Sequence, residues 1–452
     1  MKKRPNIVFL FTDDQRYDTI NALNNPNIHT PNMDRLVERG TAFTHAHIMG
    51  GTSGAVCMPS RAMVMTGRTL FNLEDMGQTI PENHILMPQW LREQGGYHTY
   101  GIGKWHNSRE AYARGFDDGT HIFFGGMNDH WNVPTYDFDP SGEYTEGQWN
   151  VNPGYHSTEK FADAAAGFIS SYDKKNPFFL YVAFMAPHDP RTMPAKFLKM
   201  YDPDKIEIPA NFQPMHPFDN GEMVVRDEML AEHPRNEREV RNHIADYYAM
   251  ISHLDEHIGR VLDALEASGQ LDNTIIVLAG DNGLAVGRHG LMGKQNLYDH
   301  SVRVPLIFAG PGIPQGKSTE EFAYLLDIFP TLCGLTGLGV PETVNGMDLT
   351  ETIRNDALAR QELYLAYTHV QRAVRTRTHK LIEYVVNNKC TTQLFDLSND
   401  PDEIHDLSQN ADQQERLTAL REILLQDHKA LNDLRDREAA FWKGYLKRGE
   451  RI

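Results

Sequence analysis

Residues 57–68 read C-M-P-S-R-A-M-V-M-T-G-R, a stretch that predicts a short helix beginning at a reactive side chain. Pro59 suits the first turn of a helix, where its missing N–H leaves no hydrogen bond unmade, and Gly67 provides a stop. Cys57 would then lie at the helix N-terminus, where free N–H groups favour an anion. Arg61 follows four residues later on the same helix face. The group suits chemistry on a tetrahedral oxyanion such as sulfate or phosphate; a buried Cys beside a surface Arg is the simpler alternative.

The composition describes an acidic globular chain. It has 452 residues, of which 40% are hydrophobic and 23% charged, which is enough for one large domain and a smaller one. The formal net charge is −17 and no basic stripe is present, which argues against nucleic-acid binding. The chain holds three cysteines, too few for a disulfide framework. Besides Cys57, we therefore expect Cys333 and Cys390 to be buried free thiols rather than a pair.

The apolar run at residues 7–11 is too short for a signal sequence or a membrane span, and it predicts a buried first strand. The sequence as written therefore predicts a cytoplasmic protein without a membrane partner. If a leader has been removed, a periplasmic or secreted location is expected instead.

Two predicted buried strands end in oxygen-bearing side chains. Residues 7–11 lead into Asp13 and Asp14, and residues 273–279 lead into Asp281 and Asn282. In open α/β sheets ligands bind at the carboxyl ends of strands, and adjacent carboxylates need a cation to offset their repulsion. A set of oxygen ligands alone suits Ca²⁺ or Mg²⁺ rather than zinc.

Two further strand ends carry groups suited to proton transfer and anion binding. Residues 96–106 (G-Y-H-T-Y-G-I-G-K-W-H) place Lys104 and His106 two positions apart, on the same side of an extended segment. Residues 177–186 form a continuous apolar run, typical of a central buried strand, and His188 follows it between prolines. A histidine held there is well placed to move a proton.

Candidate substrate contacts lie in loops. Residues 115–147 are rich in Gly, Asp, Asn and aromatic residues without a sustained period, which predicts a long substrate-facing loop. A structural insertion over the sheet is the alternative. Arg191 either contacts an anionic group of the substrate or is a solvated loop residue, and residues 201–235 are expected at the pocket rim. The candidates for sugar or leaving-group contacts in the first loop are Asn128, His130 and Trp131.

These motifs resemble those of the type I sulfatase family, in the alkaline-phosphatase superfamily. C-x-P-S-R followed by T-G-R is similar to the family's first signature, and G-Y-x-T-x-x-x-G-K-x-H to its second. The resemblance implies that a formylglycine-generating enzyme oxidises Cys57 to formylglycine, whose hydrate is the nucleophile. It also implies a bound metal, calcium rather than magnesium. The metal ligands implied, with residue 57 beside them, are Asp13, Asp14, Cys57, Asp281 and Asn282.

The resemblance also implies roles for the cations and histidines. Arg61, Lys104 and Lys294 would stabilise negative charge on the sulfate. His188, helped by Lys294, would protonate the departing oxygen, and His106 would act as the base on residue 57. The implied catalytic set is Cys57, Arg61, Lys104, His106, His188 and Lys294.

The implied activity is hydrolysis of a sulfate ester, and the polar and aromatic loop favours a sulfated carbohydrate over other sulfated small molecules. A phosphonate or phosphate ester hydrolase on the same scaffold is the alternative enzyme. A non-catalytic binding protein for sulfated glycans is the alternative from another class.

Strand–helix alternation with chemistry at strand ends predicts an α/β fold with a mostly parallel central sheet sandwiched by helices. The resemblance adds the alkaline-phosphatase-like architecture. The Gly- and Pro-rich residues 337–346 separate a catalytic domain, 1–345, from a C-terminal subdomain, 346–452. Short alternating strands predict a small antiparallel sheet in the subdomain, followed by one amphipathic helix over residues 414–451.

On two predicted helices, the sequence leaves open whether certain side chains face solvent. On the predicted helix over residues 239–268, His253 and His257 are spaced like metal ligands, but no H-E-x-x-H motif accompanies them, so we expect a solvated face. Exposed aromatic residues on the terminal helix would suit a docking surface or a homo-oligomer contact, and packing on the chain's own subdomain is the alternative. These aromatic residues are Phe441, Trp442 and Tyr445.

Overall fold

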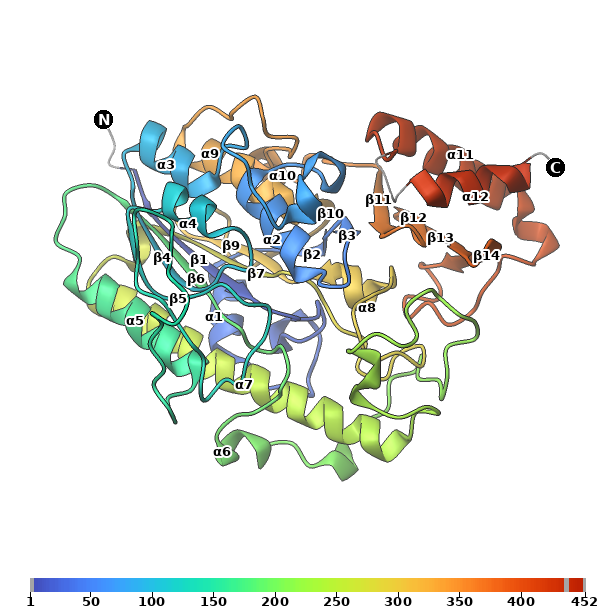
Figure 1. Ribbon diagram of the computed structural model, residues 1–452, viewed down its shortest axis with the longest axis horizontal. Coiled ribbons are helices and arrows are strands. Elements are labelled where there is room, and N and C mark those ends of the chain that lie inside the picture. Colours follow the sequence, from blue (N-terminus) through green and yellow to red (C-terminus); the bar gives the residue numbers. More distant parts are fainter. Residues whose placement is uncertain (1–3, 435–438, 450–452) are drawn as a thin grey trace.

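The computed structural model describes residues 4–434 and 439–449, which form two sheets flanked by helices (Figure 1). The larger sheet has nine strands in the order β10-β2-β9-β7-β1-β6-β4-β5, with β8 beside β2. Its strands are β1 (Asn6–Thr12), β2 (Gly40–His47), β4 (His98–Lys104), β5 (Asp118–Phe123), β6 (Phe178–Ala183), β7 (Thr274–Gly280), β8 (Arg303–Val304), β9 (Leu306–Ala309) and β10 (Lys317–Tyr324).

The centre of this sheet is parallel and buried on both faces. β1 pairs in parallel with β6 and β7, so that Phe9 lies between Tyr181 and Val277. Every residue of these three strands is buried, as their continuous apolar sequences predict. Only β9 and β8 run antiparallel to their neighbours. The predicted mostly parallel central sheet is therefore confirmed.

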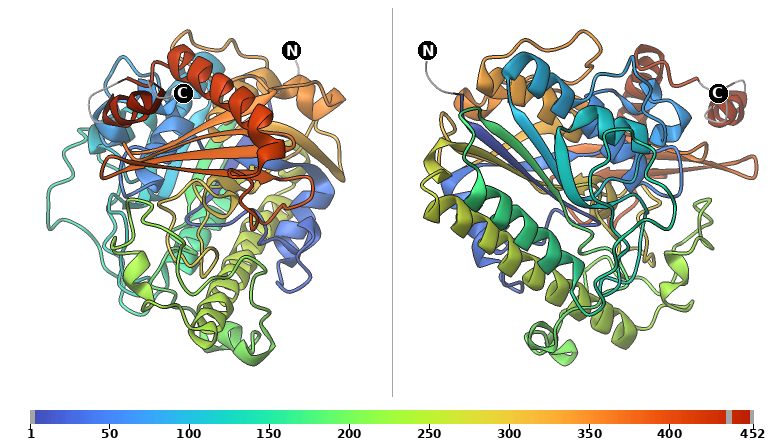
Figure 2. Two further views of the ribbon diagram at one scale, coloured as in Figure 1. Left: turned by 90° about the vertical axis from the view of Figure 1, so that its right-hand side faces the viewer. Right: turned by 60° about the vertical axis from the view of Figure 1, so that its left-hand side comes forward.

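Helices cover both faces of the large sheet (Figure 2). Val8 and Leu10 of β1 pack into one core, with α1 (Pro31–Arg39), α5 (Ser157–Ser171) and α7 (Glu237–Ala267). Phe9 belongs to the core on the opposite face, with α2 (Cys57–Thr66), α3 (Met87–Gly95) and α9 (Ile328–Thr336). The alternation follows from the two-residue repeat of a strand. Shorter helices are α4 (Arg109–Gly115), α6 (Ala195–Leu198), α8 (Asp299–Val302) and α10 (Thr350–Asn355).

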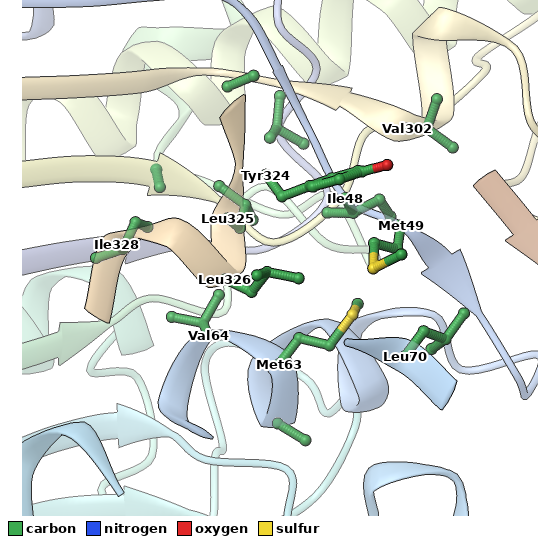
Figure 3. Packing of buried hydrophobic residues seen from close by; sticks show 14 of the residues in the cluster. Ile48, Met49, Met63, Val64, Leu70, Val302, Tyr324, Leu325, Leu326 and Ile328 are labelled. Atoms are coloured by element: carbon green, nitrogen blue, oxygen red, sulfur yellow. The ribbon is translucent and has the colours of Figure 1, made fainter. Parts of the chain in front are cut away.

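Helix α2 is buried along its whole length and ends as the sequence predicts. Met63 and Val64 pack in the same cluster as Ile48, Leu325, Leu326 and Ile328 (Figure 3). Gly67 caps the helix in the left-handed conformation, with φ 63°, and its N–H donates to Met63 O. Because the helix is enclosed on all sides, its first residue is held in one position.

The smaller sheet combines two parts of the chain. Its order is β14-β13-β12-β11-β3, antiparallel except where β3, from the first part of the chain, pairs in parallel with β11. The predicted small antiparallel sheet is thus present, whereas the boundary at residue 345 stays a prediction. The strands are β3 (Gly50–Gly51), β11 (Glu362–Tyr367), β12 (Gln371–Thr376), β13 (His379–Val386) and β14 (Lys389–Asp396).

The expected single helix over residues 414–451 is wrong. The described residues form α11 (Gln414–Ala430) and α12 (Ala439–Gly449), and Asn432, with φ 56°, turns the chain away from α11. Residues 435–438 and 450–451 of the expected helix lie outside the described part of the chain.

The aromatic residues of α12 pack on their own subdomain. Phe441, Trp442 and Tyr445 are all buried, the Trp442 ring stacks on His428 at 3.8 Å between ring centroids, and the Tyr445 hydroxyl donates to Glu383. The docking surface considered from the sequence is therefore not exposed.

Two expectations from the sequence are wrong, one because the side chains are buried and the other because the segment pairs as a strand. His253 and His257 do not face solvent, because α6 and the segment before α5 cover that side of α7; the His253 ring lies 4.9 Å from Phe197 and 4.6 Å from His156. Part of the expected loop over residues 115–147 is a strand, β5, which pairs with β4.

Neither remaining thiol is in a disulfide. Cys333 is buried, as expected, and Cys390 is partly buried. Among the residues described, no helix combines the length and apolar character needed to cross a membrane.

Candidate active site

Four neighbouring parallel strands, β7, β1, β6 and β4, end at the same edge of the large sheet. The segments that follow their carboxyl ends carry most of the predicted site residues. This convergence follows from parallel pairing, which brings equivalent strand ends together. Helix α2 delivers Cys57 and Arg61 from the other side, and the segment after β5 carries Asn128, His130 and Trp131.

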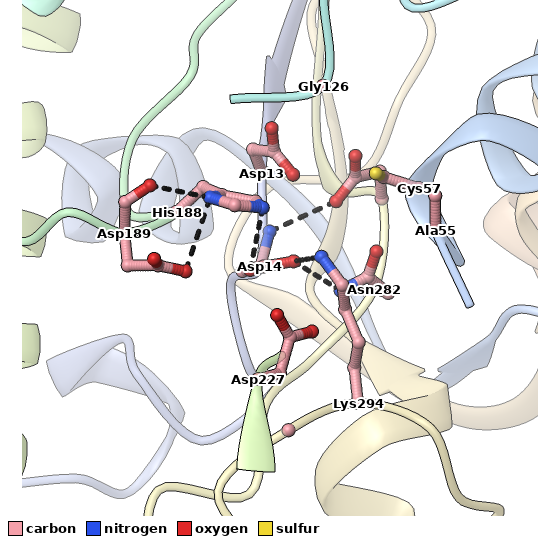
Figure 4. Close-up of polar contacts among 12 residues, drawn as sticks. Asp13, Asp14, Ala55, Cys57, Gly126, His188, Asp189, Asp227, Asn282 and Lys294 are labelled. Atoms are coloured by element: carbon pink, nitrogen blue, oxygen red, sulfur yellow. Dashed lines mark hydrogen bonds and ion pairs between the residues drawn. The ribbon is translucent and has the colours of Figure 1, made fainter. Parts of the chain in front are cut away.

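Oxygen atoms from the ends of β1 and β7 meet at this edge (Figure 4). The Asp14 N–H donates to Asp281 Oδ1 at 3.0 Å, and Asn282 Nδ2 donates to Asp14 Oδ1 at 2.6 Å. Ligand atoms of Asp13, Cys57 and Asp281 lie within 4.8 Å of one another, and so do those of Asp13, Asp14 and His188. The predicted oxygen ligands therefore form one buried cluster beside residue 57.

The donor set fits a hard cation. Asp13 Oδ1 and Asn282 Oδ1 are buried without a hydrogen-bond partner. Burial, with the nearby charge of Asp13, raises the pKa of Asp281 to about 7. Burial also opposes ionisation of Asp13, but the charges of Lys104 and Arg61 outweigh it and hold the Asp13 pKa below normal. Unpaired oxygens among repelling carboxylates are the surroundings in which Ca²⁺ or Mg²⁺ binds.

The three predicted cations are buried against these carboxylates. Arg61 Nε and Nη2 each lie 2.9 Å from Asp281 Oδ2, and its guanidinium stacks over the Phe11 ring at 4.9 Å. Lys104 Nζ forms an ion pair with Asp13. Lys294 Nζ lies 2.6 Å from Asp14 Oδ1; although burial disfavours its charge, the pair with Asp14 keeps the Lys294 pKa well above normal.

Cys57 is the first residue of α2 and lies among these groups. Its Sγ is 3.2 Å from His106 Nδ1 and 3.8 Å from Lys104 Nζ. Burial nevertheless raises the pKa of the Cys57 thiol to about 11. The thiol is therefore protonated at neutral pH and is not an activated thiolate.

Both predicted histidines hold neutral rings. Burial lowers the pKa of His106 well below its usual value and that of His188 to about 4. His188 Nδ1 lies 2.7 Å from Asp189 O, which leaves Nε2 directed toward Asp14 Oδ2 at 3.7 Å. Each neutral ring has one N–H to donate and one nitrogen to accept a proton. His106 has a φ of 64°, a strained value that orients its ring against Gly126.

A pocket of about 300 Å³ opens onto the cluster, lined by Cys57, His106, His188 and Lys294. The segment 225–227 forms another part of its wall, which agrees with the expectation that residues 201–235 lie at the rim. The further lining residues are Gly54, Ala55, Gly126, Met127 and Gln295.

Asp227 is the pocket residue that sequence reasoning missed. Its carboxylate accepts from Arg226 Nη1 at 2.8 Å and from Gln295 Nε2 at 2.7 Å, and Arg226 also forms an ion pair with Asp189. No periodic signal surrounds Asp227 in the sequence, so nothing there distinguishes it from a solvated acid. Its position is set by contacts with distant segments.

The four predicted substrate contacts do not line this pocket. His130 is fully buried, with Nδ1 2.8 Å from Ser157 Oγ and Nε2 3.0 Å from His188 O, so both ring nitrogens are used and the residue supports the His188 loop. Arg191 is not a solvated loop residue, because its guanidinium stacks over Tyr247 at 5.7 Å. The remaining two candidates, also outside the pocket wall, are Asn128 and Trp131.

The central parallel sheet, with buried oxygen ligands and cations at its carboxyl edge, defines a hydrolase of the alkaline-phosphatase type. Residues 5–338 match the family described as Sulfatase, and residues 287–430 match N-sulphoglucosamine sulphohydrolase, C-terminal. The first match spans well over half of the chain, so the chain belongs to the sulfatase family and is a sulfuric ester hydrolase. The resemblance stated from the motifs is confirmed.

Named relatives and solved structures agree with this assignment. The chain is 28% identical to N-acetylglucosamine-6-O-sulfatase of Bacteroides thetaiotaomicron, covering 98% of this chain and 90% of the relative. It is 30% identical to a sulfatase of Formosa agariphila, covering 93% and 86%. A protein solved in complex with its substrate, D-glucosamine-2-N,6-O-disulfate, superposes with a TM-score of 0.81 at 25% identity, covering 96% and 99% of the two chains.

The fold is also shared with an enzyme of different specificity. The phosphonate monoester hydrolase of Agrobacterium radiobacter superposes with a TM-score of 0.78 at 21% identity, covering 95% of this chain and 96% of that one. At this identity the likeness extends to the fold alone.

Proposed function

We infer that this sulfatase hydrolyses the sulfate ester of a carbohydrate, with residue 57 as nucleophile after oxidation of Cys57 to formylglycine. The observation that carries the proposal is the position of Cys57 at the start of α2, 3.2 Å from a neutral histidine nitrogen and among the oxygen ligands. A thiol whose pKa is raised to about 11 is a poor nucleophile at neutral pH, whereas a hydrated aldehyde offers hydroxyl groups at the same point.

A divalent cation completes the proposed site. Its ligands would be Asp13, Asp14, Asp281 and Asn282. The unpartnered oxygens of Asp13 and Asn282 suit Ca²⁺, with Mg²⁺ as the alternative. When bound, the cation would supply positive charge next to the sulfate and lower the pKa of the nucleophilic hydroxyl.

The chain's own side chains would perform the proton transfers and hold the sulfate. His106, next to the side chain of residue 57, is placed to accept a proton from its hydroxyl. The ammonium group of Lys104, 3.8 Å from the same side chain, would stabilise negative charge on the sulfate oxygens.

The side chains that would protonate the departing oxygen lie on the opposite side of the pocket. His188 and Lys294 both line the pocket, and both approach Asp14. A donor N–H on His188, supported by the charge of Lys294, is therefore positioned to protonate the leaving oxygen of the sugar. Arg61, buried behind Asp281, orients that carboxylate.

The volume and the lining of the pocket suit a small polar leaving group. Its volume of about 300 Å³ lies at the lower end of the range for small-molecule sites, which suits one sugar ring. Asp227 and Gln295 would accept or donate hydrogen bonds to sugar hydroxyls. One relative named N-acetylglucosamine-6-O-sulfatase and a neighbour solved with a sulfated glucosamine support an amino sugar.

The test combines mass spectrometry of the peptide that contains residue 57 with sulfate release from 4-nitrophenyl sulfate. We expect an aldehyde at residue 57 in active protein and turnover that depends on an added divalent cation. Unmodified Cys57 in an active preparation would refute the mechanism. Faster turnover of an aryl phosphonate than of the aryl sulfate would favour the phosphonate hydrolase instead.

A further inference from the structure

A second cavity adjoins the reaction pocket. Its volume is about 590 Å³, and His106 lines both spaces. The second cavity also touches Met58 and Gly125, the neighbours in sequence of Cys57 and Gly126. The His106 ring separates the two spaces and packs closely on Gly126, where an added Cβ would lie 2.8 Å from His106 Nε2. Two linked chemical units could therefore occupy the two spaces at the same time.

Aromatic rings form one wall of the second cavity. Phe124, Tyr136 and Trp149 line it, with ring centroids 5.6 Å apart for Phe124 and Tyr136 and 6.1 Å apart for Tyr136 and Trp149. Trp149 is 38% exposed, an unusual state for so large an apolar side chain. The backbone next to it is nevertheless held, since Asn150 and Thr135 exchange backbone hydrogen bonds at 2.7 and 2.9 Å. An exposed but held aromatic platform suits a ligand with one apolar face.

An unpaired cation lies on this platform. The Arg109 guanidinium stands 5.5 Å from the Phe124 ring centroid and 5.4 Å from that of Tyr136, and it donates to Tyr144 O. Within residues 4–434 and 439–449, no carboxylate lies within ion-pair distance of Arg109. Glu110 also lines the cavity and is not paired with it. A partly buried guanidinium with free N–H groups is a site for a carboxylate or sulfate.

We propose that the second cavity is a saccharide subsite, which binds an anionic sugar unit linked to the one that carries the reacting sulfate. The apolar face of that sugar packs on Trp149 and Tyr136, and its carboxylate or sulfate group pairs with Arg109. The preferred substrate is then an acidic oligosaccharide rather than a free monosaccharide. This proposal rests on the proposed function, because it takes a sulfated sugar as the group held at residue 57.

The kinetic experiment compares three kinds of sulfated substrate. They are N-acetylglucosamine 6-sulfate, the same sugar linked through O1 or O4 to glucuronic acid, and the same sugar linked to glucose. We expect wild-type kcat/KM to be about 10-fold higher for one of the acidic disaccharides than for the monosaccharide, mainly through a lower KM. Equal values for all three substrates would overturn the proposal.

Two variants separate the aromatic from the ionic contribution. Trp149→Ala is expected to remove most of the preference for both disaccharides over the monosaccharide. Arg109→Gln is expected to remove the preference for the acidic disaccharide over the neutral one. Matched controls are Met200→Ala, an exposed apolar residue, and Arg39→Gln, whose guanidinium pairs with an exposed Asp272. A uniform loss on all three substrates in both variants would indicate a structural role and overturn the assignment.

A binding measurement separates this proposal from the proposed function. Calorimetric titration of full-length Cys57→Ala with the acidic disaccharide should show binding, weakened about 10-fold by adding Trp149→Ala. If the wild-type protein releases no sulfate from 4-nitrophenyl sulfate, the proposed function fails, and the titration still decides the subsite. Equal affinity with and without Trp149 would overturn the subsite alone.

Discussion

The carboxyl edge of the large sheet and the core of the smaller sheet bury charges to the same depth but pair them differently. Arg372 of β12 and Asp433, which follows α11, are fully buried. Arg372 Nη2 donates to Asp433 at 2.9 Å, and the Trp442 indole N–H adds a hydrogen bond to Asp433 at 3.0 Å. At the sheet edge, Asp13 Oδ1 and Asn282 Oδ1 keep no partner. Complete pairing of buried charge is a structural arrangement, whereas incomplete pairing marks a place for a ligand.

The largest expected effect is at the reacting residue itself. Cys57→Ala should lower kcat/KM for 4-nitrophenyl sulfate by about 10⁴-fold or more, because the nucleophile is removed. The unfolding temperature should change little, as one small side chain is shortened. Cys390→Ala, at a partly buried cysteine of the smaller sheet, is the matched control and should keep wild-type turnover. A comparable loss of turnover in both variants would contradict the distinction between the edge of the large sheet and the smaller sheet.

Removing one carboxylate of the oxygen cluster tests the cation directly. Asp281→Asn should lower turnover by about 10³-fold, since a charged group that supports the transition state is lost. After chelation, added Ca²⁺ should stabilise the wild-type protein by about 2.7 kcal/mol at 100 times its Kd, and the variant much less. Differential scanning fluorimetry measures both shifts. Asp272→Asn, at a side chain 95% exposed, should respond to Ca²⁺ like the wild type.

Breaking the buried Arg372–Asp433 ion pair should lower the stability of the fold and leave catalysis unchanged. Asp433→Asn leaves the Arg372 guanidinium buried without its counter-ion, which should cost about 3–5 kcal/mol of unfolding free energy. Urea unfolding measures the loss, and turnover per folded molecule should stay at the wild-type value. Asp204→Asn breaks the solvent-exposed pair with Arg238 and should cost less than about 1 kcal/mol. A drop in turnover beyond the fraction unfolded would contradict the structural assignment of this pair.

The smallest effect is expected from a variant that displaces the His106 ring. In Gly126→Ala the new Cβ would meet His106 Nε2 at 2.8 Å, so the ring must move from its position beside residue 57. We expect about a 10²-fold loss of kcat with little change in stability, because catalytic geometry tolerates displacement poorly. Gly167→Ala, on the exposed side of α5 with no atom within 4 Å of its Cβ, should leave turnover unchanged and slightly stabilise the helix. Unchanged kcat in Gly126→Ala would show that the His106 position is not critical.

Residues at strand ends could be placed from the sequence because a local pattern identifies them. Asp13 and Asp281 each follow a continuous apolar run, and parallel pairing brings such ends together. The same reasoning placed His188 after β6. It failed for His253, because the residues that bury it come from α6 and from the segment before α5, and no spacing within α7 reveals them.

By itself, the sequence determined the apolar runs that become the central strands, the helix that begins at Cys57, and the polar residues that each strand end carries. These features depend on neighbours a few positions away, through strand and helix periodicity. Tertiary structure alone decided that Asp227 lines the reaction pocket and that Trp149 and Arg109 share a second cavity. Asp227 and Trp149 lie on segments without a repeat, and Arg109 is the first residue of α4; contacts between segments far apart in the chain direct their side chains.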